Sequence, residues 1–308
     1  MTRFSQIGRS WPARAASLLA LLGAALATGP PLEAQANERA LFVSVLDDAG
    51  VPVAGLAPGD FVVEEDGVER EVLRVGPATE PMQIALLVDT SGSAQAAIPD
   101  VREGLTALVT RLHEDHEIAL VAFGQRPQIL VESTRRLDRL EDGIGQLFGF
   151  SNTAAYLLDA LVETAGGFER RESPRPVIVA FTTEGLDYSN RDSRQTLDAL
   201  RAARVATHVV VLRESGLALR SDPALADSIR ERDIVLAQGP ARTGGLRRDL
   251  LTPNGIDDAL GEIASVLTSQ YEVVYSRPAS LIPPDEITVR MRRDDLRAHG
   301  APARQTGD

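Results

Sequence analysis

One short loop, Asp89-Thr90-Ser91-Gly92-Ser93, carries a carboxylate and two hydroxyls at the spacing D-x-S-x-S. It directly follows a fully apolar run, 84–88, which is typical of a buried parallel strand. In open α/β sheets, ligands bind beyond the carboxyl ends of the strands, which is where this order places Asp89, Ser91 and Ser93. All three offer hard oxygen atoms, and such donors suit Mg²⁺, Mn²⁺ or Ca²⁺ rather than zinc.

Two further loops offer oxygen atoms at matching places in the predicted topology. Residues 151–154 (Ser-Asn-Thr-Ala) precede a predicted helix, and residues 182–185 (Thr-Thr-Glu-Gly) directly follow the apolar run 177–181. Because the carboxyl ends of parallel strands converge at one edge of a sheet, we expect these loops to lie beside the first one. A divalent cation needs about six oxygen ligands, several of them usually water. The residues of the predicted metal site are Asp89, Ser91, Ser93, Thr153 and Glu184.

The same residues have simpler explanations when each is considered alone. Asp and Ser are favoured helix caps, and Asp89 with its neighbouring serines precedes a predicted helix. Thr153 alone is typical of a helix cap, and Glu184 alone is typical of an exposed turn. Ser91 as a hydrolase nucleophile lacks the G-x-S-x-G elbow, since Asp89 stands where a glycine is needed. His208 begins a predicted strand rather than a loop, so we expect no catalytic triad and no enzyme activity.

Strands and helices alternate along the chain from residue 83 onward. Residues 128–132 follow the second strand after a short link, which favours antiparallel pairing at a sheet edge. A helix is expected near 224–237, followed by a Gly-rich turn at 239–245. The alternation predicts an α/β fold with a doubly wound, mostly parallel sheet covered by helices. Its buried strands are expected at 84–88, 117–123, 177–181 and 207–212.

The flanking segments carry strand signals and no helical periodicity. Asp66-Gly67, between two short polar and apolar runs, is typical of a two-residue hairpin turn. Strand-like runs also occur at 271–275 and 287–291. Isolated strands bury little surface, so we expect both flanks to pair into one small β domain. The predicted division is β segments at 37–78 and 270–295, an α/β domain at 81–269, and a frayed tail at 296–308.

The first 36 residues have the features of a secretory signal peptide. Arg3, Arg9 and Arg14 precede or begin an apolar stretch, 15–27, and Ala34-Gln35-Ala36 matches an A-x-A cleavage site. An uncleaved membrane anchor is the alternative, but the apolar stretch is short for a transmembrane helix. We therefore expect export to the periplasm, the cell envelope or the extracellular space, without membrane insertion after cleavage.

The composition argues against several classes of function. The formal net charge is −12, and a phosphate backbone would repel so acidic a chain, so we expect no binding to nucleic acid. The chain contains no cysteine, which removes disulfides, thiol catalysis and Cys-ligated metals. No G-x-G-x-x-G motif follows the first strand of the sheet, which argues against a dinucleotide site.

The sequence resembles the von Willebrand factor A domain in three features taken together. They are the D-x-S-x-S loop, the later Thr153, and the pair Glu184-Gly185 after the strand expected at 177–181. The resemblance covers roughly 81–269, and the flanks resemble bacterial secreted proteins of the "VWFA-related" type. That family builds a metal-ion-dependent adhesion site from three loops, with one position open for a carboxylate of a partner protein. The resemblance implies Ser91, Ser93 and Thr153 as direct ligands of Mg²⁺ and Asp89 as an acceptor that acts through water.

Glu184 departs from this family, which usually has Asp-Gly after the fourth strand. Glutamate is longer by one methylene and loses more rotamer entropy when it is fixed. It would reach the metal directly, act through water, or yield to Asp187. A direct carboxylate would reduce the net positive charge of the metal and weaken its attraction for a partner's carboxylate. We expect cation-dependent protein binding, with a structural scaffold carrying a degenerate metal site as the alternative.

Overall fold

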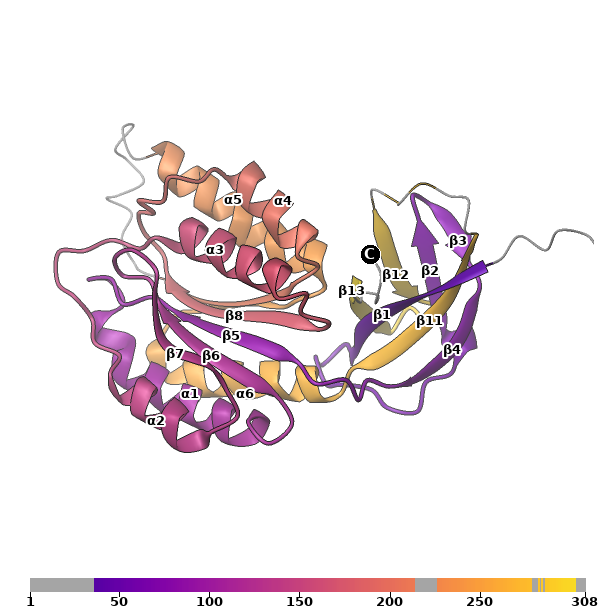
Figure 1. Cartoon of the computed structure of the whole chain (residues 1–308), viewed down its shortest axis with the longest axis horizontal. Coiled ribbons are helices and arrows are strands. Elements are labelled where there is room, and N and C mark those ends of the chain that lie inside the picture. Colours follow the sequence, from indigo (N-terminus) through magenta and orange to yellow (C-terminus); the bar gives the residue numbers. More distant parts are fainter. Residues whose placement is uncertain (1–35, 214–225, 279–281, 283, 285, 303–308) are drawn as a thin grey trace, which may run out of the picture.

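The computed structural model describes residues 36–213, 226–278, 282, 284 and 286–302. All but the last residue of the predicted signal peptide, 1–36, lie outside these ranges. A larger domain of strands and helices lies beside a smaller domain built mainly of strands (Figure 1). Among the described residues, no helix is both long enough and apolar enough to cross a membrane.

A six-stranded sheet forms the centre of the larger domain, in the order β10-β9-β8-β5-β6-β7. Five of the strands are parallel, and the edge strand β7 runs antiparallel to β6. The predicted doubly wound, mostly parallel sheet is confirmed, as is the antiparallel edge strand. The strands are β5 (Gln83–Val88), β6 (Glu117–Ala122), β7 (Gln128–Thr134), β8 (Pro176–Thr183), β9 (Ala206–Leu212) and β10 (Arg247–Leu250).

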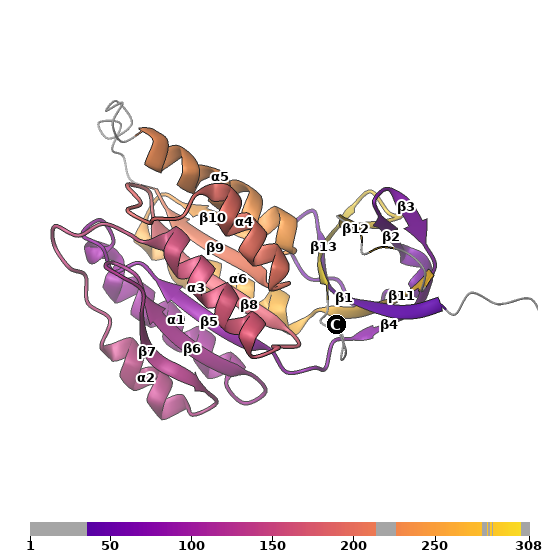
Figure 2. The same cartoon turned by 45° about the horizontal axis from the view of Figure 1, so that its top comes forward.

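Helices cover both faces of this sheet (Figures 1 and 2). Along β5, Ile84, Leu86 and Val88 enter one hydrophobic core, whereas Ala85 and Leu87 enter the other, because successive side chains of a strand point to opposite faces. One layer contains α1 (Ile98–Leu112), α2 (Leu137–Gly145) and α6 (Ile256–Thr268), and the other contains α3 (Leu157–Arg170), α4 (Ser193–Ala202) and α5 (Ala226–Thr243).

The region after β9 differs from the prediction in two ways. The turn was expected to begin at residue 239, but α5 continues through Gly239 and Pro240 and ends only at Thr243. Gly239 and Pro240 are buried, so tertiary packing outweighs their low helix propensity. β10 was not predicted, since Arg247–Leu250 is a short, mostly polar edge strand without the apolar pattern of a buried one.

The smaller domain pairs strands from both ends of the chain. Its sheets have the orders β13-β1-β11-β4 and β12-β2-β3. Phe61 and Tyr271 meet in the core between them with ring centroids 5.8 Å apart, which confirms the predicted β domain from the flanking segments. The strands are β1 (Ala36–Asp47), β2 (Phe61–Glu65), β3 (Val68–Arg70), β4 (Val72–Pro77), β11 (Tyr271–Pro278), β12 (Ile287–Met291) and β13 (Leu296–Pro302).

The expectation of a frayed tail from Leu296 is wrong for Leu296–Pro302, which form β13. β13 pairs antiparallel with β1, and Ala301 is buried in the core of the larger domain. A Cβ atom on Gly244 would lie only 2.3 Å from the carbonyl carbon of Gly300. The small residues of this segment therefore permit close packing between the domains. Residues 303–308 lie outside the described part of the chain.

Arg175, directly before β8, connects the two domains. Its guanidinium carbon lies 4.7 Å from the centre of the Phe42 ring on β1. Its nitrogens donate hydrogen bonds to the Glu80 carbonyl at 2.7 Å and to the side-chain oxygen of Gln270 at 2.6 Å. Burial lowers the pKa of Arg175 to about 10. The amino edge of the six-stranded sheet therefore faces the β domain.

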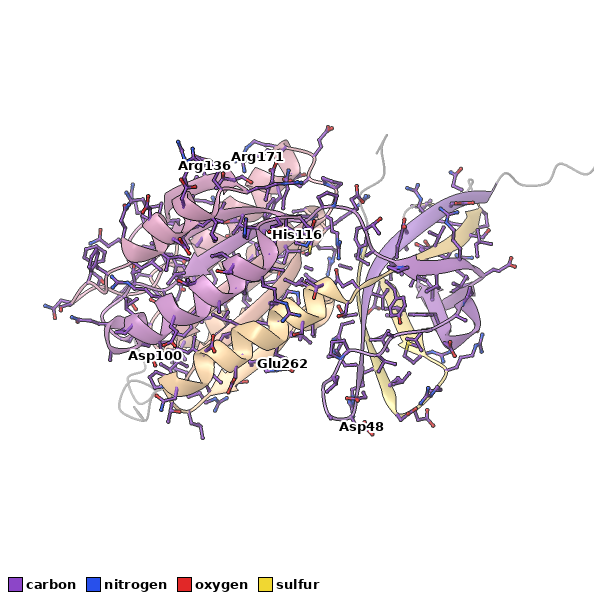
Figure 3. All side chains as sticks on the ribbon, turned by 90° about the horizontal axis from the view of Figure 1, so that it is seen from below. Asp48, Asp100, His116, Arg136, Arg171 and Glu262 are labelled. Atoms are coloured by element: carbon purple, nitrogen blue, oxygen red, sulfur yellow. The ribbon has the colours of Figure 1, made fainter. Side chains whose placement is uncertain are left out.

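The carboxyl edge of the same sheet points away from the β domain. Figure 3 shows Asp100, in the first turn of α1, at the end of the molecule far from the β domain. His116, just before β6, lies much nearer to that domain. Because β5, β6, β8, β9 and β10 are parallel, the loops that follow them all meet at this far edge.

Replacing Arg175 with alanine is expected to lower the free energy of unfolding by about 2–4 kcal/mol, because buried acceptors lose a charged donor. Denaturant unfolding of the purified protein measures this change. Arg74→Ala is the matched control, since Arg74 forms an exposed ion pair with Glu38 at 2.5 Å. An Arg175→Ala effect no larger than that of the control would contradict the assigned role.

Candidate functional site

The carboxylate of Asp89 lies at the end of β5 and is inaccessible to solvent. Its Oδ1 accepts a hydrogen bond from the Ser91 amide at 2.9 Å. Its Oδ2 accepts from the Thr182 hydroxyl at 3.0 Å, from the Thr183 amide at 3.2 Å and from the Thr183 hydroxyl at 3.3 Å. β5 and β8 are neighbours in the sheet, so Asp89 joins the loop after β5 to the carboxyl end of β8.

Three hydroxyl groups form a continuous chain beside this carboxylate. Ser91 Oγ lies 3.0 Å from Ser93 Oγ, and Ser93 Oγ lies 2.7 Å from Thr183 Oγ1. Ser91 and Thr183 are buried, whereas Ser93 is exposed, so the chain reaches the protein surface at Ser93. The structure thus brings together Asp89, Ser91 and Ser93, and adds Thr183. The sequence pattern indicated the loop of Thr183 but not the residue, because the acidic Glu184 is the more obvious ligand.

Thr153 lies beside this group without joining it. Its carbonyl accepts a hydrogen bond from the Gly92 amide at 3.2 Å, which brings its loop against the first one. Its hydroxyl, however, donates to the carbonyl of Phe150 at 2.7 Å, within its own loop. Thr153 is therefore adjacent to the hydroxyl chain, and its side chain is bonded elsewhere.

Glu184 follows β8 but faces the neighbouring strand β9 instead of the hydroxyl chain. Its Oε1 lies 3.7 Å from Nε of Arg213, the residue after β9. Arg213 also contacts Asp249 of β10 at 3.3 Å. The Glu184 amide donates to the Leu212 carbonyl at 2.9 Å, which holds this part of the loop against β9.

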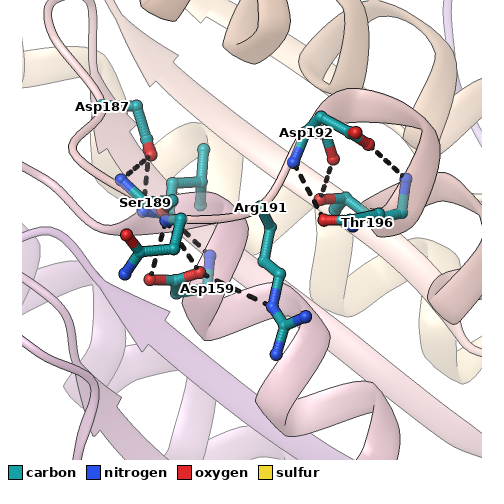
Figure 4. Close-up of polar contacts among 9 residues, drawn as sticks. Asp159, Asp187, Ser189, Arg191, Asp192 and Thr196 are labelled. Carbon is teal, nitrogen blue, oxygen red and sulfur yellow. Dashed lines mark hydrogen bonds and ion pairs between the residues drawn. The ribbon is translucent and has the colours of Figure 1, made fainter.

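Asp187 is buried and caps helix α3. Its Oδ2 accepts a hydrogen bond from the amide of Leu157, the first residue of α3, at 2.8 Å. Its Oδ1 accepts from the Ser189 amide at 2.9 Å (Figure 4). A carboxylate at a helix amino terminus satisfies a free amide and interacts favourably with the helix dipole. Of the two acidic residues considered for the metal, neither Glu184 nor Asp187 bonds to the hydroxyl chain.

Arg232 of α5 carries a positive charge beneath the loop after β8. It is 2 % exposed, and its Nη2 donates to the Thr182 hydroxyl at 2.5 Å and to the Thr183 carbonyl. Its Nη1 donates to the Gly185 carbonyl at 3.1 Å. Thr182 therefore accepts a hydrogen bond from Arg232 and donates one to Asp89. An arginine between apolar positions of α5 is the only sequence signal of this role, and it does not identify the acceptors.

The donor set of this site suits a hard divalent cation that keeps part of its water shell. Hydroxyl oxygens of Ser91, Ser93 and Thr183 lie together, with one carboxylate behind them. The described residues contain no group of three or more His, Cys, Asp or Glu that could hold a metal ion. Softer metals such as zinc, which prefer nitrogen and sulfur ligands, therefore have no matching site in this part of the chain.

Replacing Asp187 with alanine is expected to lower the free energy of unfolding by about 1–3 kcal/mol, because the buried Leu157 amide loses its acceptor. Asp187→Asn is the matched control, since its amide oxygen still accepts that bond. Denaturant unfolding compares the two variants. Equal losses for both would contradict the capping role.

The stability difference between the natural protein and Asp187→Asn is expected to depend on pH. Burial raises the pKa of Asp187, so the folded state holds this proton more tightly than the unfolded state. The stability that protonation provides is present at low pH and is lost as pH rises from the ordinary aspartate value through the raised one. Unfolding measured between about pH 3 and pH 7 should show the natural protein losing stability relative to the Asn variant as pH increases.

Part of the chain matches a known family, and the chain is similar to several solved structures. A family model described as von Willebrand factor type A domain matches residues 84–185. The chain is similar in structure to BatB from Bacteroides thetaiotaomicron, at 14 % identity and a TM-score of 0.43, with 60 % of this chain and 98 % of that chain covered. It is also similar to a von Willebrand factor type A protein from Catenulispora acidiphila, at 10 % identity and a TM-score of 0.47, with 89 % of this chain and 64 % of that chain covered.

The vWF domain of the type V pili tip protein Mfa5 from Porphyromonas gingivalis is a third similar structure. It is 11 % identical with a TM-score of 0.44, and the match covers 62 % of this chain and 96 % of that chain. No curated protein matches the chain. The matched residues run from β5 to the loop after β8 and include the whole hydroxyl chain. The likeness to the von Willebrand factor type A domain family thus rests on residues 84–185 of this chain.

Proposed function

We propose that this protein binds a partner protein through a divalent cation, Mg²⁺ or alternatively Mn²⁺ or Ca²⁺, at the Asp89 loop. The observation that carries the proposal is the hydroxyl chain Ser91–Ser93–Thr183, which ends at the surface beside the buried carboxylate. Ser91, Ser93 and Thr183 would ligate the ion, and Asp89 would orient them while acting on the ion through water. Because Asp89 already accepts four hydrogen bonds, its main role is to hold the ligands in place.

The charges around the site favour a partner with an acidic side chain. Glu184 faces Arg213 and Asp187 caps α3, so neither carboxylate neutralises a cation at the hydroxyl chain. Arg232 compensates part of the negative charge of Asp89 through Thr182. A bound divalent cation would therefore keep most of its positive charge and attract a carboxylate strongly. The protein would bind the cation itself less tightly, because fewer carboxylates surround it.

The place of action follows from the predicted signal peptide. An exported chain would meet its partner in the periplasm, at the cell envelope or outside the cell. Divalent cations are available in these compartments without competition from cytosolic nucleotides. The proposal includes no catalytic step, because the Ser91 and Ser93 hydroxyls bond to each other and to Thr183 rather than to a base.

Calorimetric titration of the mature protein with Mg²⁺ and Mn²⁺ tests the metal site. Ser91→Ala and Thr183→Val are each expected to weaken binding about tenfold or more, because each removes an oxygen from the ligand group. Glu184→Gln is the matched control and should change the affinity by less than about threefold, since Glu184 faces Arg213. The absence of heat with the natural protein, or an equal loss in all three variants, would overturn the assignment.

A scaffold with a degenerate metal site is the second candidate function, and Arg232 is the observation that favours it. Its guanidinium supplies a fixed positive charge two hydrogen bonds away from Asp89, so the loops are held together without an ion. Affinity capture from an extract of the native host, with and without EDTA, separates the two functions. Loss of the captured partner in EDTA and in Ser93→Ala supports cation-dependent binding, whereas retention in both supports the scaffold.

A further inference from the structure

We propose that the carboxyl edge of the six-stranded sheet docks a protein segment that presents one carboxylate flanked by apolar side chains. The part of this proposal that concerns the carboxylate rests on the proposed function, because the carboxylate would bind the cation at the hydroxyl chain. The apolar part rests on a separate observation, the distribution of exposed apolar residues in the α/β domain. We call these residues the apolar rim, and they are Ile129, Phe148, Phe150, Tyr188 and Leu251.

The apolar rim includes every large exposed hydrophobic side chain among the described residues of the α/β domain. Leu251 follows β10, and Tyr188 lies on the loop after β8. Ile129 pairs with Val121, one residue before the carboxyl end of β6. Scattered exposed apolar residues are ordinary, but their restriction to one edge of a domain is typical of a binding surface.

Phe148 and Phe150 lie directly against the proposed cation loop. The Phe150 amide donates to the Thr90 carbonyl at 2.9 Å, and a Cβ atom on Gly149 would lie 2.5 Å from Cα of Gln95. The two phenyl groups nevertheless remain 59 % and 49 % exposed. The Tyr188 amide donates to the Ala155 carbonyl at 2.9 Å, so its loop joins the same surface, with the ring 53 % exposed.

The rim is organised before any partner binds. The Arg102 guanidinium carbon lies 4.8 Å from the centre of the Phe148 ring, and Arg102 also donates to the Leu147 carbonyl. These contacts restrict the loop that presents Phe148. Rigid aromatic side chains lose little conformational entropy on binding, and they dominate the energetics of protein interfaces.

The charges at this edge indicate which partner fits the rim. Arg126 is exposed in the turn after β6, and Gly124 of the same turn donates its amide to the Thr90 hydroxyl in the proposed cation loop at 3.0 Å. The positive charges of Arg126 and of the proposed cation favour a carboxylate at the centre of the contact. The apolar side chains next to that carboxylate would then contact the apolar rim. The chain itself has a formal net charge of −12, so a second copy would be repelled. A segment of another protein that carries one carboxylate between apolar side chains, and no large negative charge of its own, matches both features.

Selection from a displayed peptide library tests the proposal, with one fixed central Asp flanked by random positions and the mature protein as bait in Mg²⁺. We expect enrichment of Leu, Ile, Phe or Trp on at least one side of the Asp. The Kd of an enriched peptide is then measured by fluorescence polarisation. Phe148→Ser combined with Phe150→Ser should weaken it about tenfold or more, while the calorimetric Mg²⁺ affinity remains unchanged. Leu73→Ser, at an exposed apolar position of the β domain, is the matched control and should have no effect.

The outcomes separate this proposal from the metal site. Peptide binding that is lost in the double Phe variant but retained in EDTA and in Ser91→Ala supports the rim and rejects the cation. Enrichment without apolar residues, no enrichment, or equal Kd values for the double Phe variant and the natural protein would overturn the rim. Self-association in sedimentation experiments that the double Phe variant abolishes would also overturn it, because the occupant would then be a second copy.

Discussion

The buried carboxylate of Asp89 is the interaction on which the carboxyl edge of this protein depends. An ionised group inaccessible to solvent is tolerated only when hydrogen-bond donors replace water. Asp89 obtains one donor from its own loop and three from Thr182 and Thr183, the last two residues of β8. The need to satisfy this charge draws the loop and the end of β8 together, and the meeting of Ser91, Ser93 and Thr183 is a consequence. Asp89 bonds both to the Ser91 amide and to Thr183, and so it joins the residues that carry these hydroxyls.

Arg232 and Arg213 place positive charges near Asp89 and Glu184, respectively. Arg232 holds the carbonyls on both sides of Glu184, those of Thr183 and Gly185, so the course of the loop is restrained from below. Arg213 attracts the Glu184 side chain toward β9. The longer acidic residue therefore forms an ion pair at the neighbouring strand, and a hydroxyl occupies the place nearest Asp89. This arrangement leaves a single carboxylate at the hydroxyl chain, and the loop is organised by arginines of α5 and of the segment after β9.

The amino edge of the central sheet contacts the β domain, whereas the carboxyl edge faces away from it. At the amino edge, Arg175 contacts Phe42 and Gln270 and attaches the β domain through buried polar groups. Strands from before and after the larger domain make up that domain, which lies beside the larger one (Figure 1). The carboxyl edge is consequently the end of the molecule that remains available, and the exposed apolar residues of the α/β domain gather there. A rigid attachment on one side and a surface suited to binding on the other follow from the parallel arrangement of the strands.

Local patterns determined much of this structure. Continuous apolar runs identified the buried strands, and D-x-S-x-S placed Asp89, Ser91 and Ser93 on one loop. The strand signals at both ends of the chain were sufficient to predict a joint β domain. These features depend on interactions between near neighbours and on the burial of apolar residues, which the order of residues records directly.

Only the tertiary structure decided how distant side chains are partnered. Leu296–Pro302 is poor in apolar residues and becomes a strand because β1 supplies its hydrogen bonds. Thr183 and Glu184 are adjacent in the sequence, yet one bonds to Asp89 and the other to Arg213, because each pairing partner lies on a different neighbouring strand. The direction of a polar side chain depends on which charges surround it after folding, and a single sequence does not contain those distances.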